Sequence, residues 1–229
     1  MSDERGFTLV ELLVAMSLAV VVMLGIFSLI EVTNRGSARV ASRVNADQLA
    51  RPVMQRLLDE LHSTCVGPNT TPVLAGSGDS SLTFLEQTGA AVSPTPDKHV
   101  VSLAGGALSE SVYAATGGTA PNWTFAASPA STQQLLTGVG AASSGSPPTS
   151  PPLFQYFAYQ GGQLSTTPLP TPLSATDAVR TSQITVSFSV ATASTHVTDT
   201  HSSVSVSDSV ALRLAPPAED TSQANPPCA

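Results

Sequence analysis

The chain has 229 residues, a formal net charge of -7 and only 11% charged residues. After Cys65 its only lysines and arginines are Lys98, Arg180 and Arg213, too few for the basic stripe that binds nucleic-acid phosphates. The length fits one domain with an anchor, or two small domains, and we expect no nucleic-acid partner.

The first element is an apolar run from residue 12 to residue 30 that contains no charged residue. As a helix rising about 1.5 Å per residue, it approaches the roughly 30 Å of a bilayer core. A secretory signal peptide would have a basic start, a shorter apolar stretch and an Ala-x-Ala site. Here Asp3 and Glu4 offset Arg5, and no such site follows. We therefore predict a membrane-spanning helix.

One acidic residue, Glu11, stands in otherwise apolar company at the start of this run. A carboxylate in a membrane helix costs up to about 2.5–3.5 kcal/mol at the helix centre, which favours a functional role with a partner. The stretch Gly-Phe-Thr-Leu-Val-Glu-Leu-Leu-Val-Ala at residues 6–15 closely resembles the processing signature of type IV prepilins and type II secretion pseudopilins.

The resemblance implies that a prepilin peptidase cuts between Gly6 and Phe7 and that the new amine on Phe7 is methylated. It also implies that Glu11 pairs with the terminal amine of a neighbouring subunit during assembly. An α-amine with a pKa of about 7.7–8.0 is mostly charged at neutral pH, so in a low-dielectric setting both groups need a partner. The alternative is that Glu11 merely lies at headgroup depth. The run lacks the proline of many major pilins, which weakens the case for a major pilin.

Three arginines, Arg35, Arg39 and Arg43, follow the apolar run, whereas only Arg5 precedes it. The positive-inside rule would place the C-terminal flank in the cytoplasm, but the processing signature implies the opposite topology. The spacing of four residues puts the three arginines on one helical face. That face is either solvated or in contact with acidic headgroups or a neighbouring subunit.

An apolar stripe continues the helical periodicity beyond the membrane segment and predicts a face that packs on a sheet. Its members are Val53, Met54, Leu57, Leu58 and Leu61. Pro52 removes one helical hydrogen bond, so we expect the helix to kink or restart there. We expect it to end near Ser63, before Gly67 and Pro68.

Strand-like runs follow, separated by turn-rich stretches. They cover residues 81–85, 111–113, 123–125, 153–159, 183–190 and 203–214, and Gly161-Gly162 turns the fourth run towards residues 163–164. Alternation with period two in the last two runs predicts an antiparallel sheet with one face buried and one solvated. The fold class is therefore α+β, in which a long N-terminal helix packs on an antiparallel β-sheet domain with long loops at residues 141–152 and 166–172.

We divide the chain into a prepilin leader (1–6), a transmembrane helix (7–30), an extracytoplasmic helix (31–64), a β-rich pilin-like domain (65–215) and a proline-rich tail (216–229). The order of a strand, an aromatic stretch ending in a glycine turn, and two long alternating strands ending in Leu-Arg-Leu resembles the group of the minor pilin PilW and the minor pseudopilin GspJ. The helix end Arg-Leu-Leu-Asp-Glu-Leu at residues 56–61 fits that group as well.

The two cysteines, Cys65 and Cys228, are a candidate disulfide if the domain lies outside the cytoplasm. The alternatives are two free thiols or a disordered tail. His196, Asp199 and His201 are close enough in sequence to suggest a metal site, but a polar loop between two strands is the favoured interpretation. We assign no catalytic residue, no metal and no cofactor.

The sequence therefore predicts a minor pilin or minor pseudopilin that is not an enzyme. Its implied partners are other pilin or pseudopilin subunits, prepilin peptidase and a membrane assembly machinery. It would cross the cytoplasmic membrane once, with its C-terminal domain outside the cytoplasm, and enter a cell-surface or periplasmic filament. Three alternatives stay open: a major pilin, a membrane-tethered adhesin or ligand-binding module, and an anchored exported enzyme.

Overall fold

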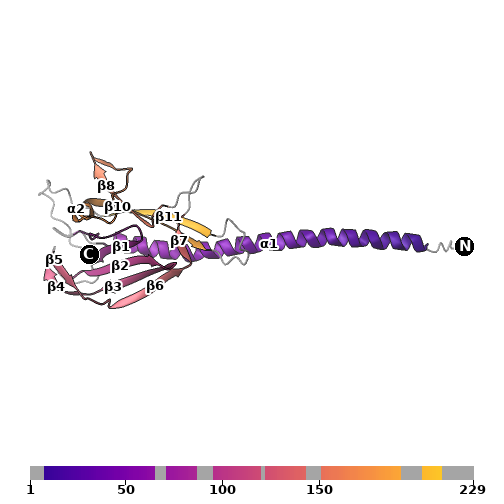
Figure 1. The fold of residues 1–229 in the computed structure, drawn as a ribbon, viewed down its shortest axis with the longest axis horizontal. Coiled ribbons are helices and arrows are strands. Elements are labelled where there is room, and N and C mark those ends of the chain that lie inside the picture. Colours follow the sequence, from indigo (N-terminus) through magenta and orange to yellow (C-terminus); the bar gives the residue numbers. More distant parts are fainter. Residues whose placement is uncertain are drawn as a thin grey trace. The chain divides into compact units, whose positions relative to one another are not determined.

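The computed structural model describes residues 8–64, 71–86, 95–119, 122–142, 151–191 and 203–212 (Figure 1). The elements are α1 (Leu9–His62), β1 (Ser81–Glu86), β2 (Asp97–Ala104), β3 (Ala107–Tyr113), β4 (Ala115–Thr119), β5 (Asn122–Phe125), β6 (Ser131–Thr137), β7 (Val139–Ala141), β8 (Phe154–Gln160), β9 (Gln163–Leu164), α2 (Ala175–Arg180), β10 (Thr181–Ala191) and β11 (Ser203–Ala211). The chain divides into two compact units, residues 1–44 and 45–229.

Helix α1 runs through both units, and we call residues 9–44 its N-terminal segment and residues 45–62 its C-terminal segment. Of the kink or restart expected at Pro52, the restart is wrong, because α1 continues through this residue as one helix. The missing N–H of Pro52 removes a single hydrogen bond, and the apolar side chains buried on both sides of it hold the helix in register. The predicted end is confirmed, since the last helical residue is His62.

The C-terminal segment buries one face against the strands of its own unit. The buried side chains are Ala46, Ala50, Met54, Leu57 and Leu61, with Val53 and Leu58 partly buried beside them. The predicted stripe is confirmed, and two alanines extend it towards the N-terminus. Figure 1 shows the strands gathered around this segment of α1.

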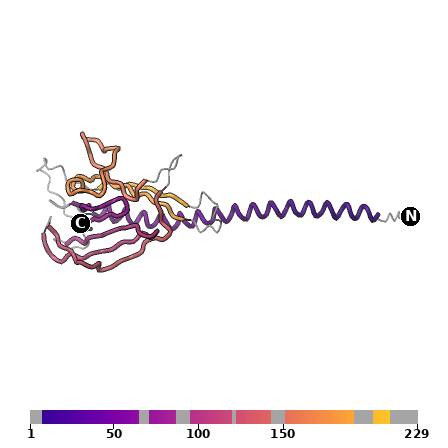
Figure 2. The backbone as a smooth tube through the Cα atoms, viewed as in Figure 1, coloured from indigo at the N-terminus to yellow at the C-terminus, as the bar shows by residue number. Residues whose placement is uncertain are grey.

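The first sheet has the strand order β1-β2-β3-β6, and all its pairings are antiparallel. Strands β2 and β3 join through Gly105 and Gly106, whose φ angles of 58° and 75° suit a two-residue hairpin turn that other residues adopt with strain. The small sheet of β4 and β5 is an excursion between the neighbours β3 and β6, as the backbone trace in Figure 2 shows.

The second sheet has the order β11-β10-β8-β9, and β7 pairs with β10 beyond the end of β8. Residues Ile184, Val186, Phe188 and Val190 of β10 are buried, as their alternation predicts. The opposite face was expected to be solvated, but Ser187 and Ser189 are also buried. Their hydroxyls explain this, because Ser187 Oγ lies 2.6 Å from Ser207 Oγ and Ser189 Oγ donates to the Ala141 carbonyl at 2.8 Å.

Both sheets and the C-terminal segment of α1 share one hydrophobic core. Its largest fully buried side chains are Tyr156, Phe84, Phe154 and Phe188. The predicted α+β fold, a long N-terminal helix packed on antiparallel sheets, is therefore confirmed. Strands β2, β4, β6 and β7 and helix α2 were not predicted as elements.

Candidate functional site

The first described residues form a hydrogen-bonded cap on α1. The Thr8 N–H and hydroxyl both donate to Glu11 Oε2, at 3.1 Å and 3.0 Å, and the Glu11 N–H donates to Thr8 Oγ1 at 3.3 Å. This reciprocal arrangement is a capping box, which satisfies N–H groups that the first turn of a helix leaves without partners. Glu11 therefore has a structural role within the chain, which the sequence analysis did not anticipate.

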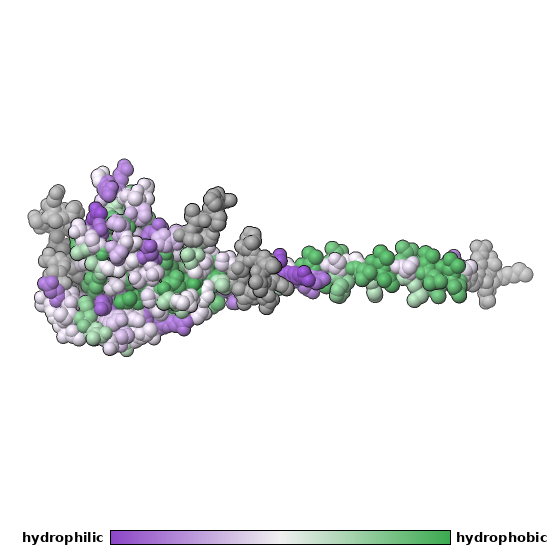
Figure 3. Space-filling view, in the orientation of Figure 1, coloured by the Kyte–Doolittle hydropathy of each residue, from purple (hydrophilic) through white to green (hydrophobic). Residues whose placement is uncertain are grey.

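The N-terminal segment of α1 exposes its apolar side chains. Every residue from Thr8 to Ala41 is exposed, and one stretch of 18 residues has a mean hydropathy of 2.7. In Figure 3, hydrophobic residues cover most of the visible surface of this segment. Its length and composition are those of a helix that crosses a membrane.

The remaining predicted site residues lie outside the part of the chain that the structure describes. This holds for the predicted cleavage site at Gly6 and Phe7 and for both cysteines, Cys65 and Cys228. The His196–His201 stretch lies outside it as well. These assignments therefore stay predictions.

A buried polar cluster, missed in the sequence, joins the C-terminal segment of α1 to the first sheet. Arg56 donates through Nε to Glu60 Oε1 at 2.7 Å and through Nη2 to Glu110 Oε2 on β3 at 2.6 Å. Its Nη1 donates to Gln133 Oε1 on β6 at 3.0 Å. Glu110 is only 2% exposed, so the guanidinium neutralises a carboxylate inside the domain.

His99 on β2 occupies the centre of the same cluster. Its Nδ1 lies 2.7 Å from Glu110 Oε1, and its Nε2 lies 3.3 Å from Glu86 Oε2 on β1. The hydroxyl of Ser63, just after α1, donates to Glu86 Oε1 at 2.9 Å. Phe84 stacks on the imidazole with ring centroids 5.2 Å apart. Only an imidazolium donates from both ring nitrogens, so the geometry fits a protonated His99.

The surroundings shift the pKa values of these groups in different directions. Burial would lower the pKa of His99, but its hydrogen bond to Glu110 and the charge of Glu86 raise it overall above its ordinary value of 6.5. Burial would raise the pKa of Glu110, but the His99 hydrogen bond and the charge of Arg56 lower it overall. Burial raises the pKa of Glu60 in spite of its hydrogen bond from Arg56.

Three members of the cluster have the side-chain types that bind metals. One donor atom each from Glu60, His99 and Glu110 lies within 4.8 Å of the others. Arg56 is bonded to both carboxylates, however, and His99 Nδ1 is in hydrogen-bond contact with Glu110. A divalent cation would have to displace the guanidinium of Arg56. The cluster is therefore better arranged to hold a proton on His99 than to bind a metal ion.

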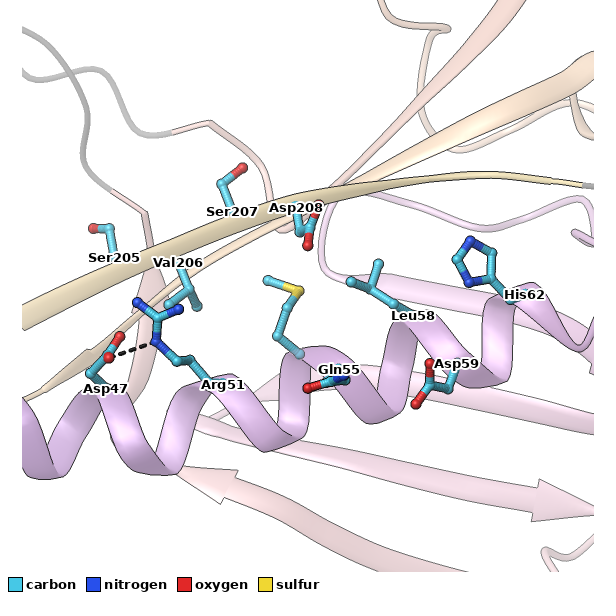
Figure 4. A pocket seen from close by; sticks show the side chains of 11 residues that line it. Asp47, Arg51, Gln55, Leu58, Asp59, His62, Ser205, Val206, Ser207 and Asp208 are labelled. Carbon is cyan, nitrogen blue, oxygen red and sulfur yellow. Dashed lines mark hydrogen bonds and ion pairs between the residues drawn. The ribbon is translucent and has the colours of Figure 1, made fainter.

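A groove of 620 Å³ lies between the C-terminal segment of α1 and strand β11 (Figure 4). Its lining residues are Asp47, Arg51, Met54, Gln55, Leu58, Asp59, His62, Ser205, Val206, Ser207 and Asp208. Asp208 interrupts the apolar alternation of β11, and in Figure 4 its carboxylate points towards α1. The groove therefore combines three apolar side chains, Met54, Leu58 and Val206, with polar and charged side chains of both signs.

Residues 1–27 match the family model of the prokaryotic N-terminal methylation motif. This motif is a prepilin signal, and it indicates a type IV pilin-like or pseudopilin-like protein, with which the α+β fold is consistent. It implies processing by prepilin peptidase, assembly with pilin subunits and anchoring in a membrane through one helix, and it suggests a structural subunit and not an enzyme. No curated protein matches the sequence.

Proposed function

We propose that the chain is a minor pilin or minor pseudopilin of the kind represented by PilW and GspJ, inserted into a type IV pilus-like or secretion filament. There it would prime or cap the filament or present a surface. The observation that carries this proposal is the N-terminal segment of α1, which joins the methylation motif to an exposed apolar surface. Such a surface needs lipid or neighbouring helices around it.

Maturation would begin with cleavage between Gly6 and Phe7 and methylation of the Phe7 amine. The processed chain would stay in the cytoplasmic membrane through residues 7–30, with its β-rich domain outside the cytoplasm. An assembly machinery would then move it from lipid into the filament. The apolar side chains of the N-terminal segment would leave contact with lipid acyl chains and enter contact with neighbouring helices. Their hydrophobic burial would therefore change little.

Within this scheme Glu11 would pair with the terminal amine of a neighbouring subunit. Its capping box with Thr8 supports the pairing, because the cap orients the carboxylate at the first turn of α1. Desolvating an amine and a carboxylate is costly unless they meet, so the pair would favour the assembled state.

Three variants separate the charge of Glu11 from its capping role. Glu11→Gln keeps a side chain that caps the helix but removes the charge, whereas Thr8→Val keeps the charge and weakens the cap. We expect Glu11→Ala and Glu11→Gln to be processed normally and to be depleted in sheared filaments, and Thr8→Val to be incorporated. Glu31→Ala is the matched control, since Glu31 is an exposed acid on the same helix, paired with Arg35. Normal incorporation of Glu11→Gln would refute the pairing role.

Copy number distinguishes a minor subunit from a major one. We expect quantitative mass spectrometry of purified filaments to find this chain far below the shaft subunit. An equal or higher amount would make it the major pilin. The groove beside β11 is the feature that a tethered ligand-binding module would use, and such a module would be processed but absent from filaments.

We also propose that Cys65 and Cys228 form a disulfide. Cys65 follows directly after Thr64, the last described residue beyond α1, and Cys228 comes 16 positions after Leu212, the residue that follows β11. Figure 4 shows Ser205 above Asp47 and Asp208 further along, between Arg51 and Leu58, so β11 runs towards the end of α1 that precedes Cys65. An extended stretch of sixteen residues spans up to about 50 Å, which is long enough for Cys228 to turn back towards Cys65.

This bond would close a loop of more than 100 residues and contribute about 4–5 kcal/mol by chain entropy. We expect the exported protein to resist thiol labelling until a reductant is added. Two cysteines that react without reductant would contradict the bond.

A further inference from the structure

The cluster of Arg56, Glu60, Glu86, His99 and Glu110 lies where helix and sheet meet, and it is built from four separate elements. Arg56 and Glu60 come from α1, Glu86 from β1, His99 from β2 and Glu110 from β3. Elsewhere the C-terminal segment of α1 packs on the strands through apolar side chains. These charged contacts are therefore directional interactions within an otherwise apolar interface between helix and strands.

The protonation of His99 decides the charge balance of this cluster. Three carboxylates face the guanidinium of Arg56 and the imidazole of His99, and Glu110 and His99 are almost fully buried. With His99 protonated, each ring nitrogen donates to a carboxylate. With His99 neutral, one of its two carboxylate contacts loses its proton, and the carboxylates repel one another across a few ångströms of poorly solvated space.

We propose that this cluster is a proton-operated latch, closed when His99 is protonated, that holds the C-terminal segment of α1 on the β1-β2-β3-β6 sheet. Within the described chain the charged groups facing the imidazole are the three carboxylates and Arg56. Lys98, the next residue on β2, points away and lies over the rings of Tyr113 and Phe125, at 4.3 Å and 5.4 Å from their centroids. No described lysine therefore competes for the carboxylates.

The direction of the pH effect follows from the groups involved. Because the pKa of His99 is raised on folding, its contribution to stability is fully present below its unfolded pKa, about 6.5, and is lost as the pH rises through its folded pKa. Glu60, with a raised pKa, acts in the same direction. Glu110, with a lowered pKa, destabilises the domain only as the pH falls through that lowered value. The latch is therefore tightest in mildly acidic solution and loosens at alkaline pH.

Trp123 gives a selective readout, because it is the only tryptophan and lies on β5 in the domain. The full-length chain in detergent micelles would be unfolded with denaturant at pH 5.5, 7.0 and 8.5 while Trp123 fluorescence is followed. We expect the unfolding equilibrium constant of the wild type to rise several-fold from the lowest to the highest pH. His99→Gln should remove most of this rise.

His62→Gln is the matched control, since His62 is an exposed histidine on α1, the helix that carries Arg56 and Glu60, and this variant should keep the full pH dependence. Should His99→Gln fail to fold, a side-chain NMR titration of the wild type replaces it. His99 should then titrate above the ordinary histidine pKa of about 6.5, and Glu86→Gln should lower its pKa.

Two results would overturn the latch. One is a wild-type stability that does not fall between pH 5.5 and 8.5, or that falls equally in His99→Gln. The other is zinc-dependent stabilisation of the wild type that EDTA reverses and His99→Gln abolishes, which would show that the cluster binds a metal.

Discussion

The two segments of α1 are one continuous helix with opposite surroundings. In the N-terminal segment Glu11, which precedes the apolar run, is exposed and hydrogen-bonded to Thr8 three residues before it, and the apolar side chains are exposed. In the C-terminal segment Leu57 and Leu61 are 1% exposed, and Arg56 bonds to residues more than 50 positions away.

The difference shows that the two segments have different roles. The C-terminal segment packs against strands of its own chain, so its side chains determine whether the domain folds. The N-terminal segment exposes an apolar surface from residue 8 to residue 41, which lipid and, in the proposed filament, other subunits would cover. Substitutions in the two segments should therefore affect different measurements.

The largest expected contrast is between two leucines of the same helix. Leu57→Ala removes a fully buried side chain and leaves a cavity, which should lower the free energy of unfolding by about 2–5 kcal/mol. Leu13→Ala changes a side chain that is 60% exposed and should leave domain unfolding unchanged. Denaturant titration of Trp123 fluorescence measures both. A similar loss in the two variants would show that the segments do not differ as described.

A smaller effect is expected at Tyr156, which is buried between the sheets. Its hydroxyl donates to the Gly78 carbonyl at 3.0 Å and lies 3.2 Å from the Ser81 carbonyl, and burial raises its pKa. Tyr156→Phe keeps the ring and removes the hydroxyl, so we expect a loss of about 1 kcal/mol in the same titration. An unchanged free energy of unfolding would mean that water replaces the hydrogen bond of the Tyr156 hydroxyl.

The smallest effect is expected at the surface pair of the C-terminal segment. Arg51 Nε donates to Asp47 Oδ2 at 2.6 Å, and the Arg51 side chain is 73% exposed. Exposed pairs one turn apart contribute little, so Arg51→Ala should not change domain stability measurably. A clear destabilisation would indicate that the groove beside β11 depends on this pair.

Local patterns predicted much of this molecule. The Gly161-Gly162 turn, the apolar face of β10 and the apolar stripe of α1 are short-range signals, and the structure confirms them, although the polar face of β10 is not solvated as its alternation predicted. The restart at Pro52 was mispredicted because tertiary burial on either side outweighs one missing hydrogen bond.

Strands β2 and β6 were missed for a physical reason. In β2 and β3 the inward positions include His99 and Glu110, so a charged residue stands where alternation predicts an apolar one. Arg56, the ion-pair partner of Glu110, lies 54 positions away in the sequence, and no local pattern relates the two. Charged residues at inward positions of neighbouring strands were the only available signal. Strand β6, with the sequence Ser-Thr-Gln-Gln-Leu-Leu-Thr, is an edge strand with an exposed polar start and little apolar alternation.

The central claim, a pilin-like subunit made from a prepilin, is tested most directly by the mass and N-terminal sequence of the mature protein. The chain would be purified from cells with active prepilin peptidase and from cells lacking it. The account predicts a mature protein that begins with methylated Phe7 in the first case and the full chain in the second. An intact N-terminus, with Met1 or Ser2 still present when the peptidase is active, would contradict it.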